Sequence, residues 1–290
     1  MFEGFERRQV ATSGASIALV IGGAGPPLLL LHGYPQTHVI WHKIAPALAE
    51  DFTVVAPDLR GYGDSSKPAG GDNHVNYAKR TMALDQVETM AALGFGTFAV
   101  VGHDRGGRVG HRLALDHPQR VTRLAVLDIA PTHFMYSTTD KEFATAYYHW
   151  FFLIQPFDFP ERLIGADPAY YLTTQMRRGV SDPAAFTPEA MAEYVRFFRD
   201  PATIHATCED YRAAATIDLA HDEADMGRKV TCPLLALWGA GGLVGRKYDV
   251  LVAWRERAEA VSGAALDCGH YLPEEKPAET LAALRRFLLP

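Results

Sequence analysis

The sharpest turn that the sequence predicts carries a carboxylate at its centre. The apolar run Phe98 to Val101 leads into Gly102-His103-Asp104-Arg105-Gly106, and a helical pattern begins at Arg108. In such a strand, turn and helix, the residues two before and two after the central one must be small, because the two backbones come close together. Gly102 and Gly106 meet that need. We therefore predict that Asp104 is a nucleophile, ionised at neutral pH because the reference pKa of aspartate is about 4.

Two simpler interpretations of this turn fit less well. Asp104 could be an ordinary helix cap in a glycine-rich turn, or the turn could bind a dinucleotide. A dinucleotide fingerprint needs G-x-G-x-x-G between a strand and a helix, and this turn lacks it. The glycines from Gly22 to Gly25 precede a predicted strand instead of following one. A serine esterase is excluded because no serine stands at the centre of the turn.

Three motifs between Leu31 and Arg108 carry a resemblance to a known family that covers nearly the whole chain. They are Leu31-His32-Gly33-Tyr34-Pro35, Asp58-Leu59-Arg60-Gly61-Tyr62-Gly63-Asp64-Ser65 and Asp104-Arg105-Gly106-Gly107-Arg108. Together they resemble the haloacetate (fluoroacetate) dehalogenases of the α/β-hydrolase superfamily, and the third motif is the most specific. The resemblance implies hydrolysis of a small 2-haloacid, such as haloacetate or fluoroacetate to glycolate and halide, through an ester on Asp104. It implies no metal and no cofactor.

A nucleophilic carboxylate also needs a base that activates water and an acid that orients the base. His270 precedes the last helical pattern, where the α/β-hydrolase fold places its histidine, and we assign it as the base. No carboxylate follows Leu237-Trp238-Gly239, where many superfamily members carry the acid. The resemblance therefore points to Asp128, after the predicted strand Leu124 to Leu127. Asp249 is a rival, and a helix-capping role for Asp128 is the alternative.

Two arginines beside the turn favour an anionic substrate. Arg105 and Arg108 lie three apart at the start of a predicted helix, so their side chains can share one face. Cations at a helix N-terminus oppose the helix dipole, and an anionic ligand would offset that penalty. A planar carboxylate suits the guanidinium fork. The alternative is a pair of arginines neutralised by surface acids. We also expect the backbone N–H groups of Arg105 and Tyr34 to form an oxyanion hole, which leaves the side chains for the substrate.

The resemblance also implies a halide site in the middle of the chain. His149 and Trp150 resemble the halide-binding pair of fluoroacetate dehalogenases, and Tyr211 resembles their third donor. All three are neutral donors that could solvate a departing halide. By default the aromatic run Tyr147 to Phe152 is interior packing. Two departures from the family affect the expected substrate size: Tyr34 replaces a common phenylalanine, and the stretch Thr173 to Arg178 lacks an expected tryptophan.

Two other functions remain open from the residues alone. An epoxide hydrolase shares the aspartate attack and the water-activating histidine, and Tyr147, Tyr148 and Tyr211 could protonate an epoxide oxygen. The arginine pair and the missing acid after Trp238 count against it. A non-catalytic binder of small acids is the second alternative, although it would have no use for a water-activating base.

The hydrophobic pattern predicts the strands and helices that position these residues. Short apolar runs bounded by glycine, proline or polar residues predict buried parallel strands: Leu28 to Leu31, Thr53 to Ala56, Phe98 to Val101, Leu124 to Leu127 and Leu234 to Trp238. Helical patterns lie between them: Ile44 to Leu48, Thr81 to Leu93, Arg108 to Asp116 and Ala278 to Phe287. This alternation predicts an α/β fold with a mostly parallel, doubly wound sheet and its chemistry at the carboxyl ends of the strands.

The alternation of predicted strands and helices is interrupted between about Pro131 and Ala220. Aromatic helical segments such as Phe143 to Phe152 and Pro188 to Phe198 replace it, which predicts a helical cap inserted in the core. We expect residues 1–130 and 221–290 to form the α/β-hydrolase core domain and residues 131–220 to form the cap.

Composition narrows the partners and the compartment. The 290 residues carry a net charge of −6 and no lysine- or arginine-rich block, so nucleic acid is not an expected partner. No apolar run is long enough to cross a bilayer, and Met1 to Arg8 does not have the pattern of a secretory signal. Three widely spaced cysteines match neither a disulfide framework nor a metal motif. We expect a cytoplasmic enzyme with a small-molecule substrate and no membrane partner, and the family suggests a homodimer.

Overall fold

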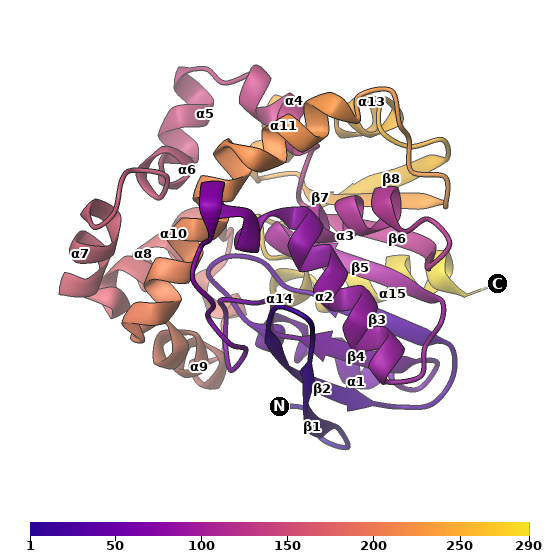
Figure 1. Cartoon of the computed structure of the whole chain (residues 1–290). Coiled ribbons are helices and arrows are strands. Elements are labelled where there is room, and N and C mark those ends of the chain that lie inside the picture. The colour runs from indigo at the N-terminus through magenta and orange to yellow at the C-terminus, as the bar shows by residue number, and fades with distance from the viewer. Residues whose placement is uncertain (290) are drawn as a thin grey trace.

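An eight-stranded sheet runs through the computed structural model, which describes residues 1–289 (Figure 1). The strands lie in the order β1-β2-β4-β3-β5-β6-β7-β8. β1 pairs with β2 and β2 with β4 in antiparallel fashion, and all the later pairs are parallel. The strands are β1 (Glu6–Ala11), β2 (Ser16–Gly22), β3 (Pro27–Leu31), β4 (Thr53–Pro57), β5 (Phe98–His103), β6 (Val121–Leu127), β7 (Leu234–Gly239) and β8 (Val261–Leu266).

Alternate residues of the central strands enter two separate hydrophobic cores. In β3, Leu29 and Leu31 belong to one core and Leu28 and Leu30 to the other. The first core is shared with α2 (Lys79–Ala92) and α3 (Arg105–Asp116), and the second with α1 (Ala45–Leu48) and α15 (Pro277–Leu288). Helices therefore cover both faces of the sheet, as in a doubly wound fold.

The predicted strands are confirmed, and three strands were missed. The five predicted apolar runs became β3 to β7, each extended by one to three residues. β1 and β8 were missed because their side chains are mostly exposed or half-buried, so they carry no continuous apolar run. β2 was missed although its pattern is partly buried, and it joins β1 in an antiparallel pair at the edge of the sheet.

Helices make up most of the segment between β6 and β7. Its helices are α4 (Thr132–Ser137), α5 (Lys141–Ala146), α6 (Tyr148–Phe152), α7 (Phe159–Ala166), α8 (Pro168–Gly179), α9 (Pro188–Phe198), α10 (Pro201–Ala215) and α11 (Ile217–Ala224). Figure 1 shows α5 to α9 gathered beyond one end of the sheet. The expected single helical segment Phe143 to Phe152 is instead two short helices, because Tyr147 has non-helical backbone angles. The division into core and cap domains stays a prediction.

Acid or threonine followed by proline starts three of these helices. Asp167, Thr187 and Asp200 precede α8, α9 and α10, and each side chain accepts a hydrogen bond from a backbone N–H in the first turn. Proline at the next position has no N–H to satisfy and its backbone already has the helical φ. The start of each helix is thus determined locally by the sequence.

The remaining helical turns complete the connections. They are η1 (His38–Trp41), η2 (Asp72–Tyr77), η3 (Pro183–Ala185), α12 (Leu243–Lys247), α13 (Val250–Arg255) and α14 (Leu272–Glu275).

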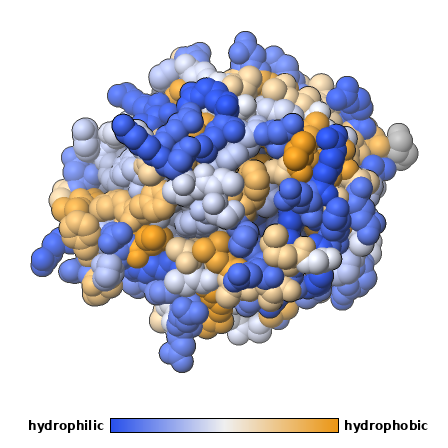
Figure 2. All heavy atoms as spheres, turned by 90° about the horizontal axis from the view of Figure 1, so that it is seen from above, coloured by the Kyte–Doolittle hydropathy of each residue, from blue (hydrophilic) through white to orange (hydrophobic). Residues whose placement is uncertain are grey.

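Hydrophilic and hydrophobic residues are mixed on the face that Figure 2 shows. Several of the most exposed large apolar side chains, Phe157, Phe159, Leu163 and Tyr170, belong to α7 or the segments beside it. Within residues 1–289, no helix combines the length and the apolar character that crossing a bilayer requires.

Backbone crowding at the turn after β5 explains its glycines. Asp104 has a φ of 45°, in the left-handed region that an L-residue rarely adopts. A Cβ on Gly106 would lie 2.3 Å from the carbonyl oxygen of Leu31, and one on Gly102 would lie 2.5 Å from that of Gly106. Strand, turn and helix can therefore meet only where these positions have no side chain.

We predict that Gly106→Ala lowers the free energy of unfolding by about 3 kcal/mol, the effect of overpacking against backbone that cannot move away. Gly165→Ala is the matched control, since a Cβ there meets no atom within 4 Å and alanine favours the helix. Chemical denaturation of both variants measures the difference. Equal stability of the two would contradict the crowding at the turn.

Candidate active site

Segments that follow neighbouring strands bring the predicted catalytic side chains to one edge of the sheet. Tyr34 follows β3, Asp104 follows β5, Asp128 follows β6 and His270 comes after β8. Because these strands are parallel, their carboxyl ends share that edge. Residues separated by up to 236 positions, from Tyr34 to His270, therefore meet in one place.

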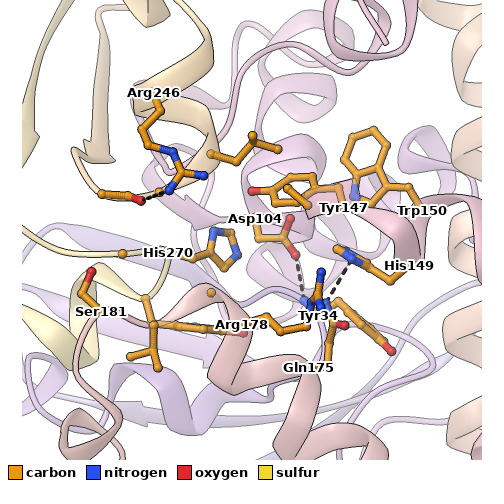
Figure 3. A pocket seen from close by; sticks show the side chains of 18 residues that line it. Tyr34, Asp104, Tyr147, His149, Trp150, Gln175, Arg178, Ser181, Arg246 and His270 are labelled. Carbon is orange, nitrogen blue, oxygen red and sulfur yellow. Dashed lines mark hydrogen bonds between the residues drawn. The ribbon is translucent and has the colours of Figure 1, made fainter. Parts of the chain in front are cut away.

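His270 and Asp128 are joined by a short hydrogen bond. The Nδ1 atom of His270 lies 2.6 Å from Oδ2 of Asp128, and Oδ1 of Asp128 accepts the N–H of Gly239 at 2.9 Å. A carboxylate on Nδ1 fixes the proton there, so Nε2 is free to take a proton from water. In Figure 3 the imidazole faces the Asp104 carboxylate. The rival Asp249 caps α13 by accepting the N–H of Val252 at 3.0 Å.

The charge around His270 sets its protonation. Burial disfavours a charged imidazole, yet the hydrogen bond and charge of Asp128, together with the charge of Asp104, raise the pKa of His270 above its ordinary value. His103 packs beside it at 4.5 Å between ring centroids and is bonded through Nε2 to the His270 carbonyl at 2.8 Å. Burial lowers the pKa of His103 to about 3, so this ring is neutral and supports the loop of His270.

Asp104 is buried, and one of its oxygens is already held. The backbone N–H of Tyr34 donates to Oδ2 at 3.0 Å, as Figure 3 shows. Burial would raise the pKa of the carboxyl, but the charges of His270, Arg108 and their neighbours hold it below its ordinary value. Arg105, the other predicted oxyanion donor, is the first residue of α3, where a backbone N–H has no partner within the helix. The second oxygen, Oδ1, is left for attack.

Arg105 is fully buried and already ion-paired. Its Nε and Nη2 donate to the carboxylate of Asp210 on α10 at 3.0 and 2.7 Å, and its guanidinium stacks on the ring of Tyr211 at 4.3 Å. Asp210 also accepts from Tyr62 at 2.7 Å and from Lys79. From the sequence we expected the whole Arg105 side chain to be available to a substrate. In the structure, its Nε and Nη2 are already bonded to Asp210. Only its Nη1 is buried without a partner.

Arg108 is buried without a carboxylate bonded to it. Its Nη1 donates to the carbonyl of Ala130 at 3.2 Å and to Thr132 Oγ1 at 2.8 Å, and its guanidinium lies over the Trp150 ring at 4.8 Å. Its Nε has no partner. Burial lowers the pKa of Arg108, and Asp104 is the first of the neighbouring charges that oppose this effect. A buried guanidinium that has no carboxylate bonded to it is costly, and an anion bound to it would lower that cost.

A cavity of about 460 Å³ opens onto these groups. Its walls include Asp104, His270 and Tyr34 together with His149 and Trp150. Arg105, Arg108 and Tyr211 are not among the lining residues and lie behind them. The Tyr211 ring packs against Tyr34 at 5.1 Å, and its hydroxyl is buried without a partner. The predicted groups therefore form one cluster, in which three members are one layer deeper than the cavity wall.

His149 is oriented by Gln175 on α8. The Nε2 of Gln175 lies 3.0 Å from Nδ1 of His149 (Figure 3). Burial lowers the pKa of His149 to about 3, so the ring is neutral at ordinary pH. With the amide donating to Nδ1, the ring proton is on Nε2, which makes that atom a donor. Gln175 and Asp210 were not predicted. The only signal for Asp210 is an acid inside a run that also contains Tyr211, and nothing local marks Gln175.

Metal chemistry has no obvious ligand set at this edge. Across the described part of the chain, residues 1–289, no three histidine, cysteine, aspartate or glutamate side chains are grouped so that they could hold a metal ion. Cys208, Cys232 and Cys268 are free thiols.

Comparison with known proteins gives a family and close relatives. The alpha/beta hydrolase fold family profile matches residues 26–277. A fluoroacetate dehalogenase from Burkholderia sp is 50% identical over 289 residues, 99% of this chain and 95% of that protein. A soluble epoxide hydrolase from Corynebacterium sp. (strain C12) is 38% identical, over 97% of this chain and 96% of that protein. A crystal structure of an alpha/beta hydrolase from Nostoc sp PCC 7120 has a TM-score of 0.99 and 66% identity, covering 100% and 99% of the chains.

We predict that Asp128→Asn moves the titration of His270 to lower pH, because the hydrogen bond and charge that most oppose the effect of burial are lost and charges such as that of Asp104 remain. The histidine ring signals in an NMR titration measure this shift. Asp249→Asn, which neutralises the rival acid, is the matched control and leaves the titration in place. A shift with Asp249→Asn and none with Asp128→Asn would exchange the two assignments.

Proposed function

We propose that this chain, which belongs to the α/β-hydrolase family, hydrolyses a small 2-haloacid to the 2-hydroxyacid and halide. The expected type of substrate is a haloacetate such as fluoroacetate or chloroacetate. The 50% sequence identity between this chain and a fluoroacetate dehalogenase, over nearly the full length of both, supports this choice. The cytoplasmic location and the homodimer stay predictions that rest on the cysteines and on the family.

One observation carries the proposal: a buried guanidinium beside the Asp104 carboxylate has no carboxylate of its own. Arg108 bonds only to neutral acceptors, and Arg105 keeps one unpartnered N–H next to its pair with Asp210. A substrate carboxylate would supply the missing negative charge. An uncharged substrate would leave Arg108 with no carboxylate bonded to it, and the nearby charge of Asp104 would be the first to offset its burial.

In the first step, Asp104 displaces the halide. With the substrate carboxylate between Arg105 and Arg108, Oδ1 of Asp104 attacks the carbon next to that carboxylate. The carbon–halogen bond breaks and its electron pair leaves with the halide. The Nε2–H of His149, the indole N–H of Trp150 and the hydroxyl of Tyr211 are the donors that would solvate the anion. Backside attack inverts the carbon.

In the second step, water cleaves the ester on Asp104. His270 Nε2 takes a proton from the water, and Asp128 stabilises the imidazolium that forms. The hydroxide adds to the carboxyl carbon of Asp104, and the negative charge gathers on Oδ2, against the N–H groups of Tyr34 and Arg105. The intermediate then expels the hydroxyacid, which receives its proton from His270. The product keeps the inverted configuration because its carbon–oxygen bond is not broken.

Epoxide hydrolysis is the second candidate, favoured by the placement of two tyrosines. Tyr147 lines the cavity with Asp104, and Tyr211, which lies behind that wall, has a buried hydroxyl without a partner. An epoxide hydrolase is also among the full-length relatives. Styrene oxide and chloroacetate, compared as substrates at equal concentration, separate the two functions. Turnover of the epoxide without halide release would replace the primary proposal.

We predict that Asp104→Asn abolishes halide release, whereas His270→Asn releases about one halide per site and then stops. Asparagine is not a nucleophile at carbon, and an ester without a water-activating base persists. Mass spectrometry of His270→Asn after chloroacetate treatment should find a carboxymethyl group on the peptide that contains Asp104. Repeated turnover by His270→Asn, or a modification elsewhere, would contradict the two-step scheme.

We predict that Arg108→Gln lowers kcat/KM for chloroacetate by about tenfold to a hundredfold, the effect of losing a charge-assisted hydrogen bond. The free energy of unfolding of this variant stays unchanged or rises, because the buried charge that is removed is hydrogen-bonded only to neutral acceptors.

Arg112→Gln is the matched control on the same helix. Arg112 pairs with Asp222 at 2.8 Å and with Asp225 and lies outside the cavity wall. Loss of the Arg112 charge should lower the free energy of unfolding by about 3 kcal/mol and leave kcat/KM unchanged. The proposal fails if Arg108→Gln is the destabilising variant and halide release is unaffected.

A further inference from the structure

The backbone around His270 is tied to the end of α8 by one carboxylate, that of Glu275, and we propose that Glu275 is a positioning residue for the ester hydrolysis. This role rests on the proposed function and adds to it a residue that does not touch the substrate. Glu275 is the last residue of α14, and its side chain reaches back to the loop that carries His270. Its loss should therefore slow the step that needs the base and spare the step that does not.

The Glu275 carboxylate accepts three backbone N–H groups from two separate segments. Oε2 accepts the N–H of Gly269 at 3.0 Å, and Oε1 accepts the N–H of Tyr271 at 2.9 Å. Oε2 also accepts the N–H of Ser181, two residues after the end of α8, at 2.7 Å. One side chain therefore holds both neighbours of His270 and joins them to a segment 94 positions away from itself.

No regular secondary structure holds the loop that carries His270. Residues 267–271 lie between β8 and α14 and belong to no helix or strand. All three N–H groups of residues 269–271 have acceptors: Glu275 takes two of them, and the carbonyl of Gly179 takes that of His270 at 2.7 Å. Without the Glu275 carboxylate, two of the three would lose their acceptor, and the loop would have to shift or bond water instead.

This loop and the end of α8 are packed backbone to backbone. A Cβ on Gly269 would lie 2.8 Å from the backbone nitrogen of Ser181. From the other side, a Cβ on Gly179 would lie 3.3 Å from the Cβ of His270. A shift of either backbone therefore moves the imidazole, and the Glu275 carboxylate joins the two segments.

The orientation of the imidazole depends on where this backbone lies. Asp128 binds Nδ1 of His270 at 2.6 Å, and His103 is bonded to the His270 carbonyl at 2.8 Å. Both bonds weaken steeply when the loop moves, because a hydrogen bond tolerates little change in distance or angle. A catalytic group that is misplaced by about 1 Å can cost about a hundredfold in rate.

Stabilisation of α14 is the simpler explanation for Glu275. Acids complement the positive end of a helix, and the first turn of α14 carries both Glu274 and Glu275. Glu274, however, is bonded to the side chains of Gln36 and Tyr194. The bonds of Glu275 go to backbone N–H groups on both sides of the base. A stabilising role predicts a less stable enzyme with unchanged kinetics once folded, whereas a positioning role predicts a change in one step alone.

The test is Glu275→Ala with chloroacetate as substrate. Its kcat/KM should stay close to that of wild type, because kcat/KM covers the steps up to the irreversible carbon–halogen cleavage. The ratio of esterified to free Asp104 at saturating substrate equals the rate of ester formation divided by that of ester hydrolysis. We expect this ratio to rise about tenfold, part of the roughly hundredfold or more that a general base supplies. Mass spectrometry of the Asp104 peptide after rapid quenching measures it.

Glu279→Ala is the matched control, since Glu279 is an exposed acid in the first turn of α15. It should leave both kcat/KM and the ester ratio at wild-type values. Glu275→Gln keeps one accepting oxygen, so its ester ratio should lie between those of wild type and Glu275→Ala. The glutamine variant also takes the place of the alanine variant if that chain does not fold.

Three outcomes would overturn this role of Glu275. An unchanged ester ratio with a lower free energy of unfolding shows a stabilising role only. A fall of kcat/KM as large as the fall of kcat, without more ester, shows a general distortion of the site. A raised ratio in Glu279→Ala as well shows that the effect does not depend on the bonds of Glu275. Absence of halide release and of ester in wild type would instead refute the proposed function itself.

Discussion

A buried carboxylate that remains ionised is the constraint on which this site depends. Asp104 is 7% exposed, and burial favours its neutral form, yet the positive groups around it keep its pKa below the ordinary value. The two arginines among those groups are themselves buried, and Arg108 has no carboxylate bonded to it. Burying several charged groups together is costly. The strained turn at Asp104, its neighbouring glycines and the helix that begins at Arg105 hold these groups in position despite that cost. An anionic substrate fits this balance because it completes the pairing.

Residues behind the cavity wall determine which atoms stay free. Asp210 binds two of the guanidinium nitrogens of Arg105 and leaves Nη1, while Gln175 occupies Nδ1 of His149 and leaves Nε2. Asp128 likewise occupies Nδ1 of His270. In all three cases a buried polar partner fixes the orientation of a nitrogen-bearing side chain at the candidate site. Asp210 and Gln175 both lie on helices between β6 and β7, so this helical segment contributes more than a cover over Asp104.

The features that could be predicted from the sequence are the strands and the turn that local residue patterns encode. β3 to β7 are continuous apolar runs, which predict strands. The glycines around Asp104 stand where a side chain would clash with backbone, and this marks the sharp turn. β1 and β8 have mostly exposed or half-buried side chains and gave no such signal. The catalytic roles of Asp128 and His270 followed from the family resemblance and remain proposals, although the structure places the two side chains in contact. Asp210 and Gln175 could not be predicted, because their partners are 105 and 26 positions away and only tertiary packing joins them.

The central claim is that Asp104 itself forms an ester that water then opens at the carboxyl carbon. A single turnover of chloroacetate in isotopically labelled water, with enzyme in excess, tests it most directly. The glycolate formed should carry unlabelled oxygen, taken from Asp104, and the heavy oxygen should appear in the Asp104 carboxylate. Labelled glycolate with an unlabelled Asp104 would show direct attack of water on the substrate and contradict the claim.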